Sequence, residues 1–148
     1  ECTVSGVPAG LGEHVFDKVD AMLAHAMLSI GAVKGIEFGS GFDCADMTGS
    51  MNNDPMRASE NGFGVEFTSN NAGGILGGIS NGNDIIFRVA VKPVPSIYQK
   101  QETVMKTEKG YENVDLEIKG RHDVCLAPRI VPVVEAMTAI VLADAILS

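Results

Sequence analysis

The stretch Gly120–Leu147, GRHDVCLAPRIVPVVEAMTAIVLADAIL, organises the rest of the chain. It opens with the polar cluster Arg121-His122-Asp123 and runs into an apolar segment that starts at Ile130. Pro132 lies near the start of this segment, where a helix tolerates proline. A helix that is apolar on nearly every side needs cover on nearly every side. We therefore expect a central helix packed between layers, with three charge-capable residues at its entrance.

Charge and composition argue against two classes of partner. The net charge of −8 disfavours a general nucleic-acid surface, although a few well-placed cations could still bind one small anion. A membrane span is the competing interpretation of the apolar segment, and Glu135 and Asp144 within it argue against that. We therefore predict no nucleic acid and no membrane as partners.

The length of the chain indicates that residues 1–148 form one domain, and its cysteines indicate the redox compartment. A chain of 148 residues can bury a real core. Its three cysteines are widely spaced and show no metal-ligand pattern, which favours free thiols in a reducing compartment. The chain begins without methionine or a secretory leader, so we expect it to be cut from a longer protein.

Apolar periodicity predicts the other main elements. A helical period runs from Val15 and Phe16 to Met27, which leaves His14 and His25 on its surface. We predict a short strand at the N-terminus and three further strands, at Val33–Phe38, Asp84–Val91 and Val114–Ile118. Because no βα unit repeats, we predict an α+β fold with mostly antiparallel pairing.

Two polar segments allow alternative interpretations. We predict that Gly39–Gly64 is a long, mobile surface loop with a helical turn near Cys44–Thr48, and it could be a lid over a site or a disordered insertion. Ser69–Gly82, SNNAGGILGGISNG, could let backbone approach a ligand, or it could form a glycine-rich hairpin. Tyr98–Tyr111 is an exposed connector or an edge hairpin.

The candidate chemistry centres on a few cations and one polar cluster. Arg88, Lys92 and Arg121 lie near turns or glycines and could hold a phosphate or carboxylate. His122 and Asp123 are adjacent, so a simple Asp–His orienting pair is disfavoured. The cluster is either part of an active site or a cap on the following helix. Cys125 has no base placed for it and is disfavoured as a nucleophile.

The chain resembles the C-terminal part of chorismate synthase over essentially all of its length. The resemblance rests on six blocks in order: GLGEHVFDKVDAMLAHAMLSI, AVKGIEFGSGF, SNNAGGILGGISNG, RVAVKPVPSI, GRHDVC and APRIVPVVEAMTAIVLAD. It implies a β-α-β sandwich, with helices between two antiparallel sheets, in a cytoplasmic homotetramer.

The resemblance also implies a reaction. Members of the family eliminate phosphate from 5-enolpyruvylshikimate 3-phosphate to give chorismate, the last step of the shikimate pathway that leads to the aromatic amino acids. This 1,4-elimination needs reduced FMN without net redox change. The family is also associated with NADP, and the sequence leaves open whether the protein or a separate reductase reduces the flavin.

Residue by residue, the resemblance implies a set of flavin contacts. They are Gly31, Ala32, Gly77, Lys92, Pro93, Val94, Pro95, Ser96 and Arg121. Arg121, His122 and Asp123 are the implied catalytic residues, with Asp123 in the proton relay near the flavin N5 and His122 at a variable position. Gly31 replaces the usual Asn or Pro, and Val124 replaces the usual proline after the GRHD block.

The family's N-terminal half, with its two catalytic histidines and several arginines, has no counterpart in these 148 residues. We therefore expect this chain alone to bind FMN weakly and to lack turnover, and we expect that N-terminal half to be its partner. Two alternatives stay open: a non-catalytic binding or assembly module with the family fold, and a phosphate-binding regulatory domain of another α+β class.

Overall fold

The computed structural model describes every residue except 61 and 63, and its centre is a three-stranded antiparallel sheet. The strand order is β1-β7-β2, with β1 at Cys2–Val4, β7 at Ile85–Val91 and β2 at Val33–Phe38. Cys2 pairs with Phe87 on one side of β7, and Phe38 pairs with the same Phe87 on the other. The predicted α+β class with antiparallel pairing is confirmed, and β2 has the predicted bounds.

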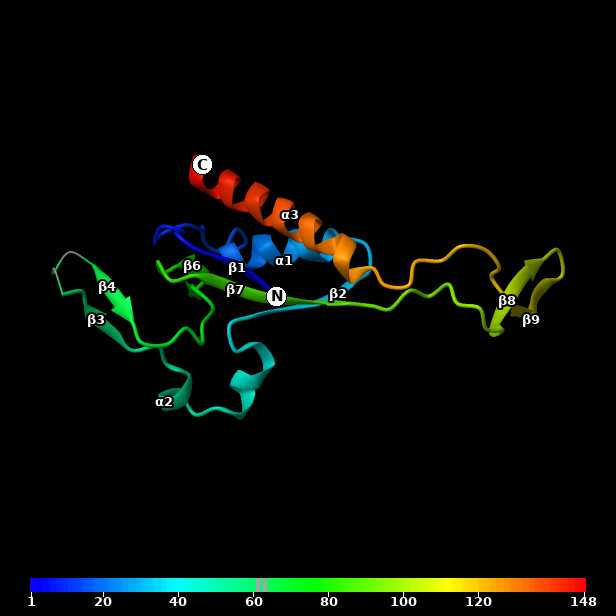
Figure 1. The fold of residues 1–148 in the computed structure, drawn as a ribbon, viewed down its shortest axis with the longest axis horizontal. Coiled ribbons are helices and arrows are strands. Elements are labelled where there is room, and N and C mark those ends of the chain that lie inside the picture. The colour runs from blue at the N-terminus through cyan, green and yellow to red at the C-terminus, as the bar shows by residue number, and fades with distance from the viewer. Residues whose placement is uncertain (61, 63) are drawn as a thin grey trace.

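Two helices cover one face of this sheet, α1 at Val19–Ser29 and α3 at Ala127–Leu147 (Figure 1). The helix α1 buries a stripe at every fourth residue, Val19, Leu23 and Met27, against Ile85 and Phe87 of β7. Among the described residues the largest fully buried side chain is Phe87, which is 1% exposed. We call the sheet β1-β7-β2 together with α1 and α3 the body.

The start of α1 differs from the prediction. Val15 and Phe16 lie outside the helix, and their side chains are 66% and 87% exposed. The residues before the helix form a turn in which the Glu13 amide donates to the Asp17 carbonyl (2.9 Å). Because Lys18 offers no capping side chain, the Val19 amide donates instead to the carbonyl of Gly78 (2.9 Å), and the helix begins there.

The cover of α3 also differs from the prediction of a helix packed between layers. It begins at Ala127, so Pro132 lies inside the helix rather than in its first turn. Among the described residues only one stripe of α3 is buried: Ile130, Val134, Thr138 and Leu142. The other side is open, with Ile140 62% exposed. By length and composition alone α3 could cross a membrane, a test that the core helices of other proteins also pass.

The excursion 39–64 contains short elements and a polar tether to the body. It includes a 3-10 helix η1 at Gly41–Asp46, a one-turn helix α2 at Gly49–Asn52, and a hairpin of β3 at Met56–Ala58 with β4 at Val65–Phe67. The 3-10 helix η1 starts three residues and ends two residues before the predicted helical turn at Cys44–Thr48. The proposed mobility of the segment stays a prediction, and residues 61 and 63 within it lie outside the described residues.

Asp54 is the anchor of this tether. Its carboxylate accepts hydrogen bonds from the Ser69 hydroxyl (2.6 Å) and the amides of Asn71 (2.7 Å) and Ala72 (2.9 Å). Burial acts to raise the pKa of the Asp54 carboxyl, but these hydrogen bonds outweigh it and hold the pKa below its ordinary value. The excursion is therefore tied to the start of the glycine-rich stretch.

The glycine-rich stretch forms a tight hairpin, which favours the hairpin interpretation over a backbone approach to a ligand. Strand β5 at Ile75–Leu76 pairs with β6 at Ile79–Ser80 through the turn residues Gly77 and Gly78. Both turn residues have positive φ, 61° and 88°, as a type I′ turn requires.

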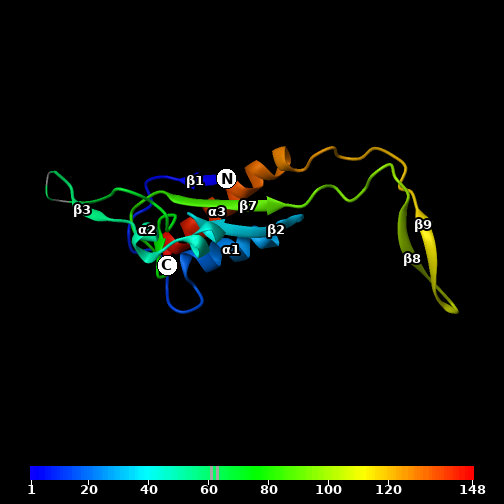
Figure 2. The same ribbon diagram turned by 90° about the horizontal axis from the view of Figure 1, so that it is seen from below.

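The chain between β7 and α3 leaves the body as an arm, residues 92–126 (Figures 1 and 2). Residues 92–100 form an outgoing linker, and residues 117–126 form a return linker without regular structure. Between them β8 at Gln101–Thr107 pairs with β9 at Gly110–Leu116, so the predicted connector is a hairpin. The predicted strand Val114–Ile118 starts earlier and ends at Leu116, which leaves the Arg121-His122-Asp123 cluster outside any strand.

Candidate functional site

Two segments with predicted flavin contacts meet where the arm leaves the body. The turn after α1 carries Gly31 and Ala32, and Ala32 has a left-handed φ of 74°. The Ala32 carbonyl accepts a hydrogen bond from the Lys92 amide (2.8 Å), just beyond the end of β7. A Cβ added to Gly31 would meet nothing within 4 Å, so this turn presents open backbone. The pairing of β2 with β7 thus brings Ala32 and Lys92 together.

The outgoing linker presents polar groups on a stiff segment. Lys92 is exposed, and Pro93 and Pro95 restrict the backbone that leads to Ser96. The Pro95 carbonyl accepts a hydrogen bond from the Gln101 side chain (3.3 Å), at the start of β8.

The return linker holds the Arg121-His122-Asp123 cluster, and its members have separate surroundings. Arg121 is exposed. The Nε2 atom of His122 lies 2.9 Å from the Ile118 carbonyl oxygen. The Asp123 carboxylate forms an ion pair with Arg129 in the first turn of α3 (3.0 Å). His122 and Asp123 therefore have different partners, as their adjacency predicts. The capping alternative is wrong, because the N-cap of α3 is Leu126 and no side chain of the described residues caps the helix.

Of the three candidate cations, Arg88 is neutralised. It lies on the sheet face opposite the helices and forms an ion pair with Glu37 (2.8 Å), whose second oxygen accepts the Phe42 amide (3.1 Å). No ion pair among the described residues involves Lys92 or Arg121. These two cations are therefore the ones available to hold an anion.

Gly77 is not brought to the other predicted contacts within this chain. Its hairpin packs beside Lys18 at the N-terminal end of α1, whereas Ala32 follows the C-terminal end. The helix has 11 residues, so the two positions are separated by about 16 Å of helix. Figure 1 shows β6 and the start of β2 near opposite ends of α1.

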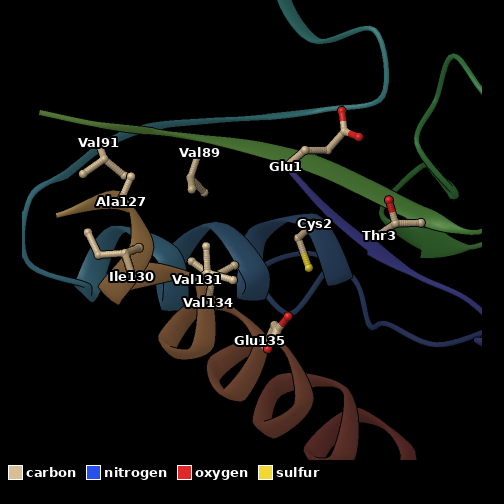
Figure 3. A pocket seen from close by; sticks show the side chains of 10 residues that line it. All are labelled: Glu1, Cys2, Thr3, Val89, Val91, Ala127, Ile130, Val131, Val134 and Glu135. Atoms are coloured by element: carbon tan, nitrogen blue, oxygen red, sulfur yellow. The ribbon is translucent and has the colours of Figure 1, made fainter. Parts of the chain in front are cut away.

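A cavity lies elsewhere, between the edge of the sheet and the first turns of α3 (Figure 3). Its volume is about 250 Å³, and its lining combines apolar residues with a few polar ones: Val89, Val91, Ala127, Ile130, Val131 and Val134 with Glu1, Cys2, Thr3 and Glu135. Burial raises the pKa of the Cys2 thiol beside it, while the Thr138 hydroxyl, 4.0 Å from the sulfur, opposes this shift. No predicted cofactor residue lines this cavity.

Sequence reasoning missed two residues that organise these segments. Asp54 tethers the excursion, and nothing in its local sequence distinguishes it from other surface aspartates. Tyr98 joins the two linkers: its hydroxyl donates to the Gly120 carbonyl, and its ring packs on the His122 imidazole. The signal that could have indicated a role for Tyr98 is its aromatic ring within an otherwise polar stretch.

Comparison with known proteins gives one consistent result. The family model described as chorismate synthase matches residues 1–147. The chorismate synthase of Lachnoclostridium phytofermentans is 58% identical over 148 residues, which cover 100% of this chain and 39% of that protein. That of Archaeoglobus fulgidus is 56% identical over 147 residues, covering 99% and 40%. A crystal structure of chorismate synthase superposes with a TM-score of 0.74 at 39% identity, over 97% of this chain and 35% of that one. The chain thus spans about two-fifths of the length of these relatives.

Proposed function

Because the chain belongs to the chorismate synthase family, we propose that it acts as part of a longer lyase. That lyase eliminates phosphate from 5-enolpyruvylshikimate 3-phosphate to form chorismate, and it uses reduced FMN. The observation that carries the proposal is 58% identity over the full chain, including the segments that hold Ala32, Lys92 and Arg121.

The residues of the site fit an anionic cofactor and substrate. Lys92 and Arg121 are exposed cations without ion-pair partners among the described residues, and Ser96 adds a hydroxyl. Gly31 and Ala32 offer open backbone beside Lys92. Together these groups suit the phosphate of a flavin mononucleotide or of the substrate. When bound, reduced FMN supplies electron density for the elimination.

The chain's own residues have two tasks in this proposal. Lys92 holds the negative charge of the flavin, and Arg121, placed near both flavin and substrate, stabilises negative charge as phosphate leaves the substrate. Asp123 takes part in proton transfer at a carboxylate oxygen. Since Asp123 is paired with Arg129 and 37% exposed, its carboxylate stays within reach of solvent and of a ligand at the return linker. His122 orients the linker through Ile118.

Partners of the chain follow from the same proposal. The open side of α3 includes Val133, Ile140 and Leu147, which are seven residues apart and are 42%, 62% and 86% exposed. A continuous apolar helix face of this kind needs a cover, and the remainder of a family protein is the cover we propose. A cytoplasmic homotetramer is the assembly we propose for the complete protein.

An anaerobic titration with reduced FMN and 5-enolpyruvylshikimate 3-phosphate tests this function. Flavin absorbance and chorismate formation are followed for this chain alone and after addition of the N-terminal part of the Lachnoclostridium phytofermentans relative. We expect turnover only in the mixture. Asp123→Ala should abolish it, whereas the control Asp115→Ala, an exposed residue of β9, should not. Turnover by the chain alone would contradict the need for the N-terminal part.

Silence in the mixture, with both parts folded and associated, would favour the alternative of a non-catalytic assembly module.

A further inference from the structure

Tyr98 lies where the outgoing and return linkers of the arm meet. Its hydroxyl donates a hydrogen bond to the carbonyl of Gly120, 22 residues further along the chain. Its ring contacts the imidazole of His122, with 4.8 Å between ring centroids and 57° between ring planes. One side chain of the outgoing linker therefore holds both the backbone and a side chain of the return linker.

The two linkers have little else to order them. Residues 92–100 and 117–126 belong to no strand ladder, and they connect the body to a hairpin that pairs with no other described strand. Segments with few buried contacts open at low free-energy cost. Gly120 has a φ of 131°, so the return linker turns at the residue that Tyr98 holds.

This arrangement sets the separation of the two available cations. Lys92 precedes Tyr98 on the outgoing linker, and Arg121 follows Gly120 on the return linker. The backbone of Lys92 is fixed to the body through Ala32, whereas the side chain of Arg121 forms no hydrogen bond or ion pair with any described residue. The position of Arg121 relative to Lys92 therefore depends on the Tyr98 contacts.

We propose that Tyr98 is a positioning residue that holds the return linker against the outgoing linker, so that Lys92 and Arg121 face one phosphate-bearing ligand. The inference rests on the proposed function, because FMN is that ligand. The hydroxyl and the ring have separate tasks. The hydroxyl holds the backbone at Gly120, and the ring sets the orientation of His122. Without them, the linkers must be ordered when the ligand binds, and this ordering lowers the affinity.

The contact itself is tested without flavin, by proton NMR of the histidines of the whole 148-residue chain. The chain has three histidines, and His14 and His25 are exposed and serve as internal references. The adjacent, tilted Tyr98 ring should shift the imidazole protons of His122, which are assigned by their loss in His122→Asn. Tyr98→Phe should retain the shift and Tyr98→Leu should abolish it. The control Tyr111→Leu, on the exposed face of the hairpin, should leave it unchanged. An identical His122 signal in the wild type and Tyr98→Leu would overturn the contact.

The positioning role is tested by the dissociation constant for FMN, measured from flavin fluorescence on the chain combined with the family N-terminal part. Tyr98→Phe should weaken binding by about fivefold, the effect of one net hydrogen bond. Tyr98→Leu should weaken it further, and Tyr111→Phe should have no effect. Equal affinity of the wild type and both Tyr98 variants would overturn the positioning role alone. Absence of FMN binding by the wild type would overturn the proposed function, and the positioning role with it.

Discussion

The body and the arm of this chain are held together by different interactions. In the body, strands far apart in sequence pair around β7, and Phe87 lies between Cys2 and Phe38 with almost no exposed surface. In the arm, β8 and β9 are neighbours in sequence and pair over seven residues each. Their side chains remain largely open, with Val104 57% and Tyr111 73% exposed.

This difference places the proposed chemistry at a boundary. Lys92 and Ala32 belong to the edge of the packed body, whereas Arg121 and Asp123 lie on the linker that returns from the arm. An isolated two-stranded hairpin is marginally stable in water. The site is therefore built from one rigid half and one half whose order depends on a few contacts.

The largest expected effect comes from the centre of the body. Phe87→Ala removes the largest buried side chain and should lower the free energy of unfolding by about 3–5 kcal/mol. Denaturant unfolding followed by circular dichroism measures this loss. The matched change in the arm, Tyr111→Ala, should cost less than about 0.5 kcal/mol because its side chain is exposed. Similar losses at the two sites would show that the arm and the body fold as one equally packed unit.

The sequence predicts the strands of the body more accurately than the start of its helix α1. Strand β2 has its predicted bounds and β7 differs by one residue, because apolar alternation in a half-buried strand is a local signal. The start of α1 was wrong because the apolar period continues through Val15 and Phe16. What decides the start is a hydrogen bond from Val19 to Gly78, which no local pattern encodes.

The sequence proposes residues for the candidate site but does not give its geometry. The family resemblance supplied Ala32, Lys92 and Arg121 as positions. The contact between Ala32 and Lys92 follows from the register of β2 and β7, which depends on long-range pairing. Tyr98 was missed because its partners are 22 and 24 residues away in sequence, counting to Gly120 and His122.

The excursion 39–64 allows an intermediate test, because a polar tether rather than apolar burial joins it to the body. Asp54→Ala leaves the amides of Asn71 and Ala72 without their acceptor and should cost about 2 kcal/mol of unfolding free energy. Urea unfolding measures the cost, and amide exchange at residues 71 and 72 locates it. Asp43→Ala, an exposed aspartate of η1, is the control and should have little effect.

The same tether has a defined pH dependence. Because the folded pKa of Asp54 lies below its ordinary value, the stabilisation is complete above about pH 4 and is lost as the pH falls through the folded pKa. The stability difference between the wild type and Asp54→Ala should therefore be constant at neutral pH and shrink in acid. A difference that persists unchanged at strongly acidic pH would mean that the carboxylate charge does not form the tether.

The smallest expected effect lies at the base of the arm. Arg129→Gln breaks the ion pair with Asp123, but both side chains are partly exposed, at 65% and 37%. Solvent screens such a pair, so the free energy of unfolding should change by less than about 0.5 kcal/mol. Arg57→Gln, at an exposed position of β3, is the matched control in the same denaturant experiment. A loss above about 1 kcal/mol would mean that the return linker is packed as part of the body, and the rigid and adaptable halves of the site would no longer be distinct.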